Sequence, residues 1–235
     1  MLVIVPARQG SRGVPGKNTK EFRGAPLAEW SFAAGLAIAR DLGAPVVCTT
    51  DDRGIAELVQ AKYVDQVLVH NRAAALADDN AGMAGVVLDV CKRFGASRYV
   101  LLQPTSPLRL IADLQVLVKE TQAHETVVSC SRPCEHPEDL IVLEEAKKGL
   151  PAIQAPKSAR RQDRVTVYRF VDGSYYAGRV NTLRDTDSFL PADTRYHTLS
   201  MPAGVDIDTP YDWAMAEAQH DWLLAQGAEF VRPRS

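Results

Sequence analysis

The segment of the chain best suited to chemistry is a glycine-rich, basic stretch near its start, ARQGSRGVPGKN at residues 7–18. Gly10, Gly13 and Gly16 permit close backbone approaches that direct amide N–H groups towards an anion. Residues 1–23 carry five basic side chains and one acidic side chain, whereas the whole chain has a formal net charge of −2. We therefore predict a phosphate-binding loop. Its spacing matches neither the dinucleotide pattern GxGxxG nor the Walker pattern GxxxxGK[ST], and the alternative, a solvated turn, leaves so many cations unexplained.

A pair of acidic residues near the end of the chain, Asp206 and Asp208, is the second candidate. On extended backbone, residues i and i+2 point to the same side, and two carboxylates so close repel unless they are solvated or share a cation. Mg²⁺ prefers such hard oxygen ligands and completes its coordination with phosphate and water. We predict that the pair binds Mg²⁺; the alternative is that Asp208 and Thr209 only cap the following helix.

Two further motifs carry polar side chains suited to ligand binding. In LLQPTSPLR at residues 101–109, the prolines favour an extended turn, which is expected to present Gln103, Thr105 and Ser106 after a strand. The sequence ARRQDR at residues 159–164 concentrates arginines, whose guanidinium forks match carboxylates and phosphates. Solvated surface arginines are the alternative for this second motif.

The elements that must position these motifs follow from periodicity. Over the first 130 residues, short β-branched or leucine-rich runs alternate with stretches of helical spacing. The predicted strands cover residues 2–5, 46–49, 66–69, 99–102 and 126–129, and the helical stripes cover residues 27–38, 55–59, 83–90 and 114–118. This alternation predicts an α/β fold with a doubly wound, mostly parallel sheet that helices cover on both faces. Phosphates bind at the carboxyl ends of such strands, so we expect the basic loop and the aspartate pair to meet around one phosphate-bearing ligand.

The pattern changes after residue 131. Prolines and a charged run at residues 144–149 interrupt it, and residues 165–170 and 174–177 predict two paired strands around an Asp172-Gly173 turn. A strand is expected again at residues 197–201. A final helix is expected over residues 210–226, with Thr209 as its N-cap and Gly227 as its stop. We therefore expect one domain over residues 1–235, with residues 131–180 forming an inserted β-rich arm.

Composition excludes several classes of protein. The chain has 235 residues, of which 46% are hydrophobic and 24% charged, which is enough apolar material for a sizeable core. A pI of about 6.2 gives no bulk preference for nucleic acid or for an anionic membrane. The apolar start of the chain is short and has no basic lead, so we interpret it as a strand and not a signal peptide. Four unevenly spaced cysteines suit reduced thiols, and we expect a cytoplasmic protein.

In combination, these motifs resemble those of the acylneuraminate cytidylyltransferases, which use CTP to activate nine-carbon 2-keto sugar acids. The resemblance runs over nearly the whole chain: ARQGSRGVPGKN at 7–18, NRAAALADD at 71–79, LLQPTSPLR at 101–109, RRQD at 160–163, DGSYY at 172–176 and VDIDT at 205–209. It implies a nucleotide-diphospho-sugar transferase-like fold and a homodimer in which each β arm completes the partner's sugar-acid pocket. It also implies CMP transfer from CTP to a keto-deoxy sugar acid, with Mg²⁺ and release of pyrophosphate.

The motifs and the resemblance together define the candidate residues. The catalytic candidates, which include both metal ligands, are Arg8, Lys17, Asp206 and Asp208. The nucleotide-binding candidates are Arg8, Gly10, Ser11, Gly13, Lys17, Asn18, Arg72 and Asp79. The candidates for binding the sugar acid are Gln103, Thr105, Ser106, Arg161, Gln162, Tyr176 and Phe189. Within this last set, the resemblance implies that Arg161 meets the carboxylate of the acid from the other subunit.

Most departures from the family pattern concern recognition of the ligands and not the transfer itself. Gly82 and Met83 stand where serines of the family usually meet the cytosine, and Asp172-Gly173-Ser174 replaces Asn-Gly-Ala. Leu190 follows Phe189 where two aromatic residues are usual. The phosphate and metal motifs are intact, so the type of reaction is better indicated than the acceptor. The alternatives are CMP transfer to an octulosonate or a phosphonate, a nucleotide-sugar glycosyltransferase, and a catalytically silent nucleotide-binding module.

Overall fold

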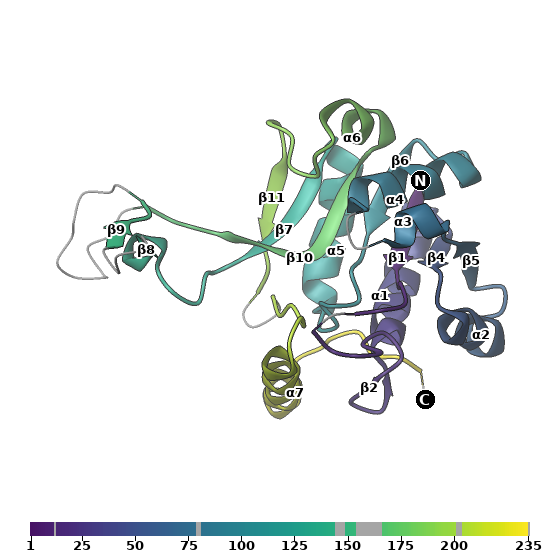
Figure 1. Cartoon of the computed structure of the whole chain (residues 1–235), viewed down its shortest axis with the longest axis horizontal. Helices are drawn as coiled ribbons and strands as arrows, with labels where there is room; N and C mark the ends of the chain where they lie inside the picture. The colour runs from purple at the N-terminus through teal and green to yellow at the C-terminus, as the bar shows by residue number, and fades with distance from the viewer. Residues whose placement is uncertain (12, 79–80, 144–148, 154–165, 201–203, 235) are drawn as a thin grey trace.

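A mixed seven-stranded sheet forms the centre of the protein (Figure 1). The computed structural model describes residues 1–11, 13–78, 81–143, 149–153, 166–200 and 204–234. The sheet has the order β11-β7-β10-β6-β1-β4-β5, and β10 alone runs antiparallel to its neighbours within it. Its strands are β1 (Leu2–Pro6), β4 (Val46–Thr50), β5 (Val67–Asn71), β6 (Arg98–Leu101), β7 (Val127–Ser131), β10 (Phe170–Arg179) and β11 (Arg195–Thr198). The prediction of an α/β fold with a mostly parallel sheet is confirmed.

Helices cover both faces of the sheet because its central strands are apolar on both sides. In β1, Val3 and Val5 belong to one core cluster, whereas Leu2 and Ile4 belong to another. The first cluster includes residues of α1 (Leu27–Leu42), α2 (Arg53–Lys62) and α5 (Ile111–Ala123). The second includes residues of α4 (Met83–Phe94) and α6 (Val180–Thr186). A short helix, α3 (Ala74–Ala77), lies between β5 and α4 in the chain.

A third core cluster joins the two ends of the chain at the carboxyl edge of the sheet. Val14 of the basic loop packs in one cluster with Ile207 and with Trp213 of α7 (Pro210–Ala225). Helix α7 begins as predicted, because the Thr209 hydroxyl accepts a hydrogen bond from the Asp212 amide and the Asp212 carboxylate accepts one from the Thr209 amide. The short strands β2 (Glu21–Phe22) and β3 (Ala25–Pro26) lead from the loop into α1. This cluster holds the basic loop against the segment that carries the aspartate pair.

The arm leaves the sheet after β7 and returns through β10 (Figure 1). Its described elements are the 3-10 helix η1 (Pro137–Asp139) and an antiparallel pair, β8 (Ile141–Leu143) and β9 (Gly149–Pro151), which lies apart from the main sheet. Strand β10 falls within residues 131–180 but belongs to the main sheet. The part of that range that projects from the body therefore precedes Phe170.

The prediction of two paired strands around Asp172-Gly173 is wrong. Residues 170–179 form one strand, β10, that pairs with β7 on one side and with β6 on the other. Gly173 has a φ of +75°, and the register with β7 shifts between Val171 and Tyr176. The local turn signal thus produces a bulge and not a hairpin, because neighbours on both sides hold the strand in the sheet.

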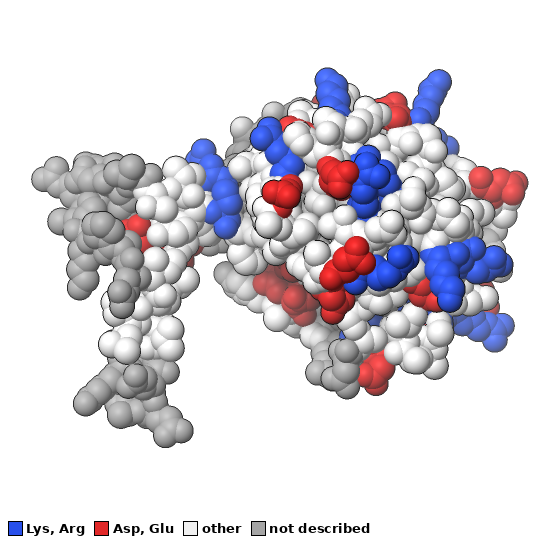
Figure 2. Space-filling model, turned by 90° about the horizontal axis from the view of Figure 1, so that it is seen from above, with Lys and Arg blue, Asp and Glu red and all other residues white. Residues whose placement is uncertain are grey.

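Charged side chains of both signs are interspersed over the face of the body seen in Figure 2. This distribution agrees with the small formal net charge of −2. Among the helices that the structure describes, none is both long enough and apolar enough to cross a lipid bilayer.

Candidate functional site

A cavity of about 390 Å³ opens at the carboxyl edge of the sheet, beside the ends of β1, β5 and β6. Pro6, Met83 and Pro104 form part of its wall. The predicted site residues that line it come from the basic loop, from the segments after β5 and β6, and from one member of the aspartate pair: Arg8, Ser11, Gly13, Lys17, Asn18, Arg72, Gln103, Thr105 and Asp208. Residues separated by about 200 positions in the sequence therefore meet around one cavity.

Lys17 joins the basic loop to the aspartate segment. Its ammonium lies 3.0 Å from Oδ1 of Asp208 and donates a hydrogen bond of 2.7 Å to the Ile207 carbonyl oxygen. Lys17 is buried, whereas 71% of the Asp208 side chain is exposed. The predicted meeting of the loop and the aspartates is therefore observed in the structure.

Gly13 makes this contact possible. A Cβ atom at this position would overlap the carbonyl oxygen of Asp208 and lie 3.0 Å from its carbonyl carbon. The loop and the Asp208 backbone can approach this closely only because residue 13 has no side chain.

Further hydrogen bonds fix the shape of the loop before any ligand arrives. The Asn18 side-chain amide donates to the Arg8 carbonyl oxygen at 2.9 Å, and the Gln9 amide donates to Asp51 at 2.8 Å. The Arg8 guanidinium donates to the Ala77 carbonyl oxygen at 3.3 Å. Gly10 is exposed and has a φ of +76°, a conformation that favours glycine. The two polar predictions Arg8 and Asn18 thus serve the loop's own structure as well as lining the cavity.

Arg72 contributes a buried positive charge to the lining of the cavity. One of its terminal nitrogens donates to the Thr49 carbonyl oxygen at 2.9 Å, and the Thr49 hydroxyl hydrogen-bonds His70 at 3.1 Å. Burial lowers the pKa of the guanidinium, and the neighbouring Asp51 carboxylate opposes that shift. Nε of Arg72 is buried and has no hydrogen-bond partner among the described residues. A cation held in this way is preorganised to meet an anionic ligand.

The aspartate pair has the donor chemistry that a magnesium ion requires. Desolvation raises the pKa of Asp206, and the Asp208 carboxylate raises it further, whereas the Thr105 hydroxyl and Lys17 oppose this shift. Asp208 lines the cavity, but Asp206 is exposed and is not one of its lining residues. Thr209 is the N-cap of helix α7, so the Asp208 carboxylate is not needed to cap the helix. No group of three or more His, Cys, Asp or Glu side chains that could hold a metal occurs in the described part of the chain. Two carboxylates are the kind of donor set that Mg²⁺ uses when a bound phosphate and water complete its coordination.

The predicted acceptor residues occupy different depths. Gln103 and Thr105 line the cavity, but Ser106 is fully buried and its hydroxyl donates to the Asp172 carbonyl oxygen at 3.5 Å. Tyr176 is half-buried, and its ring centroid lies 5.3 Å from that of Phe189. These two aromatic residues do not line the cavity but pack against the core cluster of α4 and α6. Asp79, Arg161 and Gln162 lie outside the described residues.

Sequence reasoning missed a buried polar network beneath the cavity. Arg109 and Asp172 are 3% and 1% exposed. The Arg109 guanidinium donates to the Gln103 and Ser174 carbonyl oxygens, and the Asp172 carboxylate accepts from the Ser174 amide. The only signal in the sequence was the position of Arg109 at the end of the LLQPTSPLR motif and of Asp172 at the start of DGSYY. Neither position indicates that the side chain turns inward.

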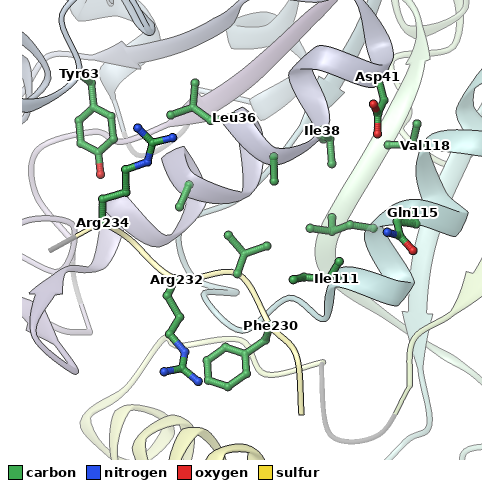
Figure 3. Close-up of a pocket in the computed structure, with 14 residues that line it drawn as sticks. Leu36, Ile38, Asp41, Tyr63, Ile111, Gln115, Val118, Phe230, Arg232 and Arg234 are labelled. Carbon is green, nitrogen blue, oxygen red and sulfur yellow. The ribbon is translucent and has the colours of Figure 1, made fainter. Parts of the chain in front are cut away.

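A second cavity, of about 430 Å³, lies between α1, α5 and the C-terminal segment (Figure 3). Arg234 and Tyr63 lie at one end of it, and Asp41 and Gln115 lie at the other. Its lining is mainly aliphatic, and among the described residues none of the predicted site residues contributes to it. The chemistry predicted from the sequence is therefore concentrated in the smaller cavity at the sheet edge.

Comparison with known families settles the class of protein. A family model described as cytidylyltransferase matches residues 2–188. This chain belongs to the cytidylyltransferase family. The match extends from β1 through α6 and so includes the basic loop, Arg72 and the segment after β6, although it ends before the aspartate pair.

Related cytidylyltransferases carry different acceptor names. The chain is 26% identical over 215 residues to N-acylneuraminate cytidylyltransferase of Streptococcus agalactiae, covering 90% of this chain and 51% of that protein. It is 28% identical over 224 residues to CMP-N,N'-diacetyllegionaminic acid synthase of Legionella pneumophila, covering 92% and 94% of the two chains. The chain thus spans about half the length of the streptococcal proteins.

Solved structures support the same fold. A structure of CMP:2-keto-3-deoxy-manno-octonic acid synthetase in complex with CTP superposes with a TM-score of 0.67 at 20% sequence identity. It covers 96% of this chain and 98% of that chain. At this level of identity the likeness concerns the architecture of the cytidylyltransferase and not its acceptor.

Proposed function

We propose that this cytidylyltransferase transfers CMP from CTP to the anomeric hydroxyl of a nine-carbon keto-deoxy sugar acid of the sialic, legionaminic or pseudaminic type. Pyrophosphate is the second product. The observation that carries the proposal is the contact between Lys17 and Asp208 at the wall of a cavity that Arg8, Arg72 and Gln103 also line. This arrangement supplies cations for a triphosphate, carboxylates for its counter-ion and an amide for an acceptor.

The reaction is a substitution at the α-phosphorus of CTP. The anomeric oxygen of the sugar acid bonds to this phosphorus, and the bond from phosphorus to the bridging oxygen of pyrophosphate breaks. Catalysis of such a transfer depends mainly on positioning and on charge neutralisation. Arg8 and Lys17 neutralise the triphosphate, and the loop amides around Gly10, Ser11 and Gly13 stabilise the departing pyrophosphate.

The aspartate pair serves the acceptor hydroxyl and the metal. Oδ1 of Asp208 accepts a hydrogen bond from the Lys17 ammonium, and one carboxylate of the pair would receive the hydroxyl proton. Asp206 and Asp208 would hold Mg²⁺, with the triphosphate and water as its other ligands. When bound, Mg²⁺ supplies Lewis-acid polarisation of the α-phosphate.

The acceptor side of the site lies after β6 and along β10. Gln103 and Thr105 line the cavity, whereas Tyr176 and Phe189 form an aromatic pair that packs against the core cluster of α4 and α6. The Legionella relative, which matches over most of its length, is a legionaminic acid synthase, and this favours a nine-carbon acid. An eight-carbon octulosonate and a phosphonate are the alternative acceptors.

We further propose that two copies form a dimer through the arm. On the arm, Leu140, Ile141, Val142 and Leu150 are all more than half exposed. An isolated two-stranded pair with apolar side chains in water is unstable, and an exposed apolar patch marks an interaction surface. In this dimer Arg161 and Gln162 of one arm complete the acid-binding pocket of the partner. We place the enzyme in the cytoplasm, where CTP is available and its cysteines remain reduced.

Shared sites are tested by complementation. Lys17→Met removes a cation of the body, and Arg161→Ala removes a cation of the arm. If arms are exchanged, each variant alone is inactive, and mixed dimers regain activity because one of their two sites contains both residues. Failure of the mixture to regain activity, after exchange of subunits has been verified, contradicts the shared site.

The transfer itself is tested by an acceptor screen. The protein is incubated with CTP, Mg²⁺ and neuraminate-, legionaminate-, pseudaminate- or octulosonate-type acids, and pyrophosphate is measured. The proposal predicts release with a nine-carbon acid and little release when UTP replaces CTP. Release with the octulosonate alone would reassign the acceptor, and CTP binding without release for any acid would indicate a silent nucleotide-binding module.

A further inference from the structure

Arg109 is a buried cation that makes no direct ion pair with a described carboxylate and instead binds backbone carbonyls. Its guanidinium donates to the Gln103 carbonyl oxygen at 2.8 Å and twice to the Ser174 carbonyl oxygen, at 3.1 and 3.2 Å. A third nitrogen donates to the Ser31 hydroxyl at 3.0 Å, and that hydroxyl donates to the same Gln103 carbonyl at 3.1 Å. One side chain therefore ties α1, the segment after β6 and the start of β10 together.

The charge of Arg109 is balanced from β10. Asp172 is buried, and its Oδ1 accepts hydrogen bonds from the Ser129 hydroxyl at 2.6 Å and from the Ser174 amide at 3.0 Å. Burial lowers the pKa of Arg109 to about 9 and raises that of Asp172, and each group opposes the other's shift. Oδ2 of Asp172 has no hydrogen-bond partner in the described part of the chain. Each buried charge therefore favours the charged form of the other.

The network ends at a side chain of the cavity. Gly173, between the two β10 residues of the network, faces Gln103, since a Cβ at Gly173 would lie 3.6 Å from Oε1 of Gln103. The backbone of Gln103 is therefore held by the hydrogen bonds that its carbonyl oxygen accepts, and its side chain lies next to the bulge of β10. The groups that bind the nucleotide phosphates in the proposed function, Lys17 and Arg8, take no part in these contacts.

We propose that Arg109 is a positioning residue for the acceptor side of the site, setting Gln103 and the β10 bulge without touching substrate. The expected effect on binding of the sugar acid rests on the proposed function. The expected effect on the structure around Gln103 and the β10 bulge does not. The planar guanidinium reaches three partners in fixed directions, and an ammonium cannot reproduce that geometry. Substitution of Arg109 should therefore impair binding of the sugar acid far more than binding of CTP.

Arg98 offers a matched control at the opposite end of β6. Its guanidinium also donates to two backbone carbonyls, those of Thr121 and His124, each at 2.6 Å, and burial lowers its pKa too. Loss of this arginine removes the same kind of hydrogen bonds away from the cavity. Arg98→Lys and Arg98→Met are therefore compared with Arg109→Lys and Arg109→Met.

Steady-state kinetics provides the first readout. Arg109→Lys is expected to raise KM for the acid by roughly tenfold while KM for CTP changes by less than about twofold. Arg98→Lys should leave KM for the acid and KM for CTP near the wild-type values, even if it lowers the melting temperature as much as Arg109→Lys does. Equal changes in both constants for Arg109→Lys, or the same acid KM in the two lysine variants, would overturn the inference.

Hydrogen exchange without substrate provides the second readout and keeps the two hypotheses apart. Arg109→Lys should accelerate amide exchange in residues 103–106 and 172–174 while β1 and β4 stay protected, and Arg98→Lys should not. A wild-type protein inactive with every acid would refute the proposed function, yet this local acceleration would still support Arg109 as the positioning residue. Unchanged amide exchange in residues 103–106 and 172–174 of Arg109→Lys would refute the positioning role of Arg109. The Lys variants keep the positive charge and the Met variants lose it, so comparison of the two shows whether the charge alone is enough.

Discussion

Gly13→Ala tests the close contact between the basic loop and the aspartate segment. The new Cβ would overlap the Asp208 carbonyl oxygen and lie 3.0 Å from the carbonyl carbon, whereas ordinary carbon contacts are about 3.5–4.0 Å. The loop must therefore move by on the order of 1 Å, which would stretch the ion pair between Lys17 and Asp208 from 3.0 Å to about 4 Å. A misplacement of about 1 Å in a site reduces turnover by roughly 100-fold, and overpacking costs about 1–3 kcal/mol of folding free energy.

The assay is pyrophosphate release with the best acceptor of the screen, combined with thermal unfolding. Gly85→Ala is the control, because a Cβ there meets only a Leu76 methyl group at 3.5 Å, and this variant should keep wild-type kcat/KM. The expected result is that Gly13→Ala remains folded at the assay temperature but loses roughly 100-fold in kcat/KM. A folded Gly13→Ala protein with kcat/KM within about threefold of wild type would refute the reasoning.

Three further predictions address the metal, a buried charge and the arm. Asp208→Asn should lower kcat by roughly 100-fold or more and weaken the dependence on Mg²⁺, while Asp212→Asn should change stability through the helix cap and retain turnover. Burial raises the pKa of Asp172, so wild type loses stability as the pH rises from the ordinary aspartate range through this raised value. Asp172→Asn cannot ionise and should lack this pH-dependent component, while it also loses the charge that balances Arg109; the difference in Tm between variant and wild type should therefore change with pH over the range in which Asp172 ionises, and a difference independent of pH would contradict this. Ile141→Asp on the exposed arm should shift the protein towards monomer in light scattering, and an unchanged dimer would exclude this part of the arm from the interface.

The elements of the sheet could be predicted because hydrophobic periodicity is a local property. The runs at residues 2–5 and 46–49 became β1 and β4 with small changes at their ends, since strands buried on both faces leave little choice of structure. The bulge at Asp172-Gly173 could not be predicted from the sequence. The same Asp-Gly signal serves a turn or a bulge, and only the strands on either side decide between them.

The site could be predicted where its residues follow strand ends. Lys17 and Asp208 are 191 positions apart, yet both belong to segments at the carboxyl edge of one sheet, so topology brought them together. Ser106 was predicted to face a ligand but is buried, because the direction of a side chain in an irregular segment depends on contacts that no local pattern encodes. The inward turn of Arg109 escaped prediction for the same reason, since its partners lie on α1 and β10.

Phosphorus NMR of a complete reaction tests the central claim most directly. With CTP, Mg²⁺ and the acceptor acid present, the account predicts that CTP is replaced by equal amounts of pyrophosphate and a CMP ester of the acid. Neither product should form when the acid is omitted. Inorganic phosphate and CDP in place of pyrophosphate, or intact CTP with every acid although the nucleotide binds, would contradict it.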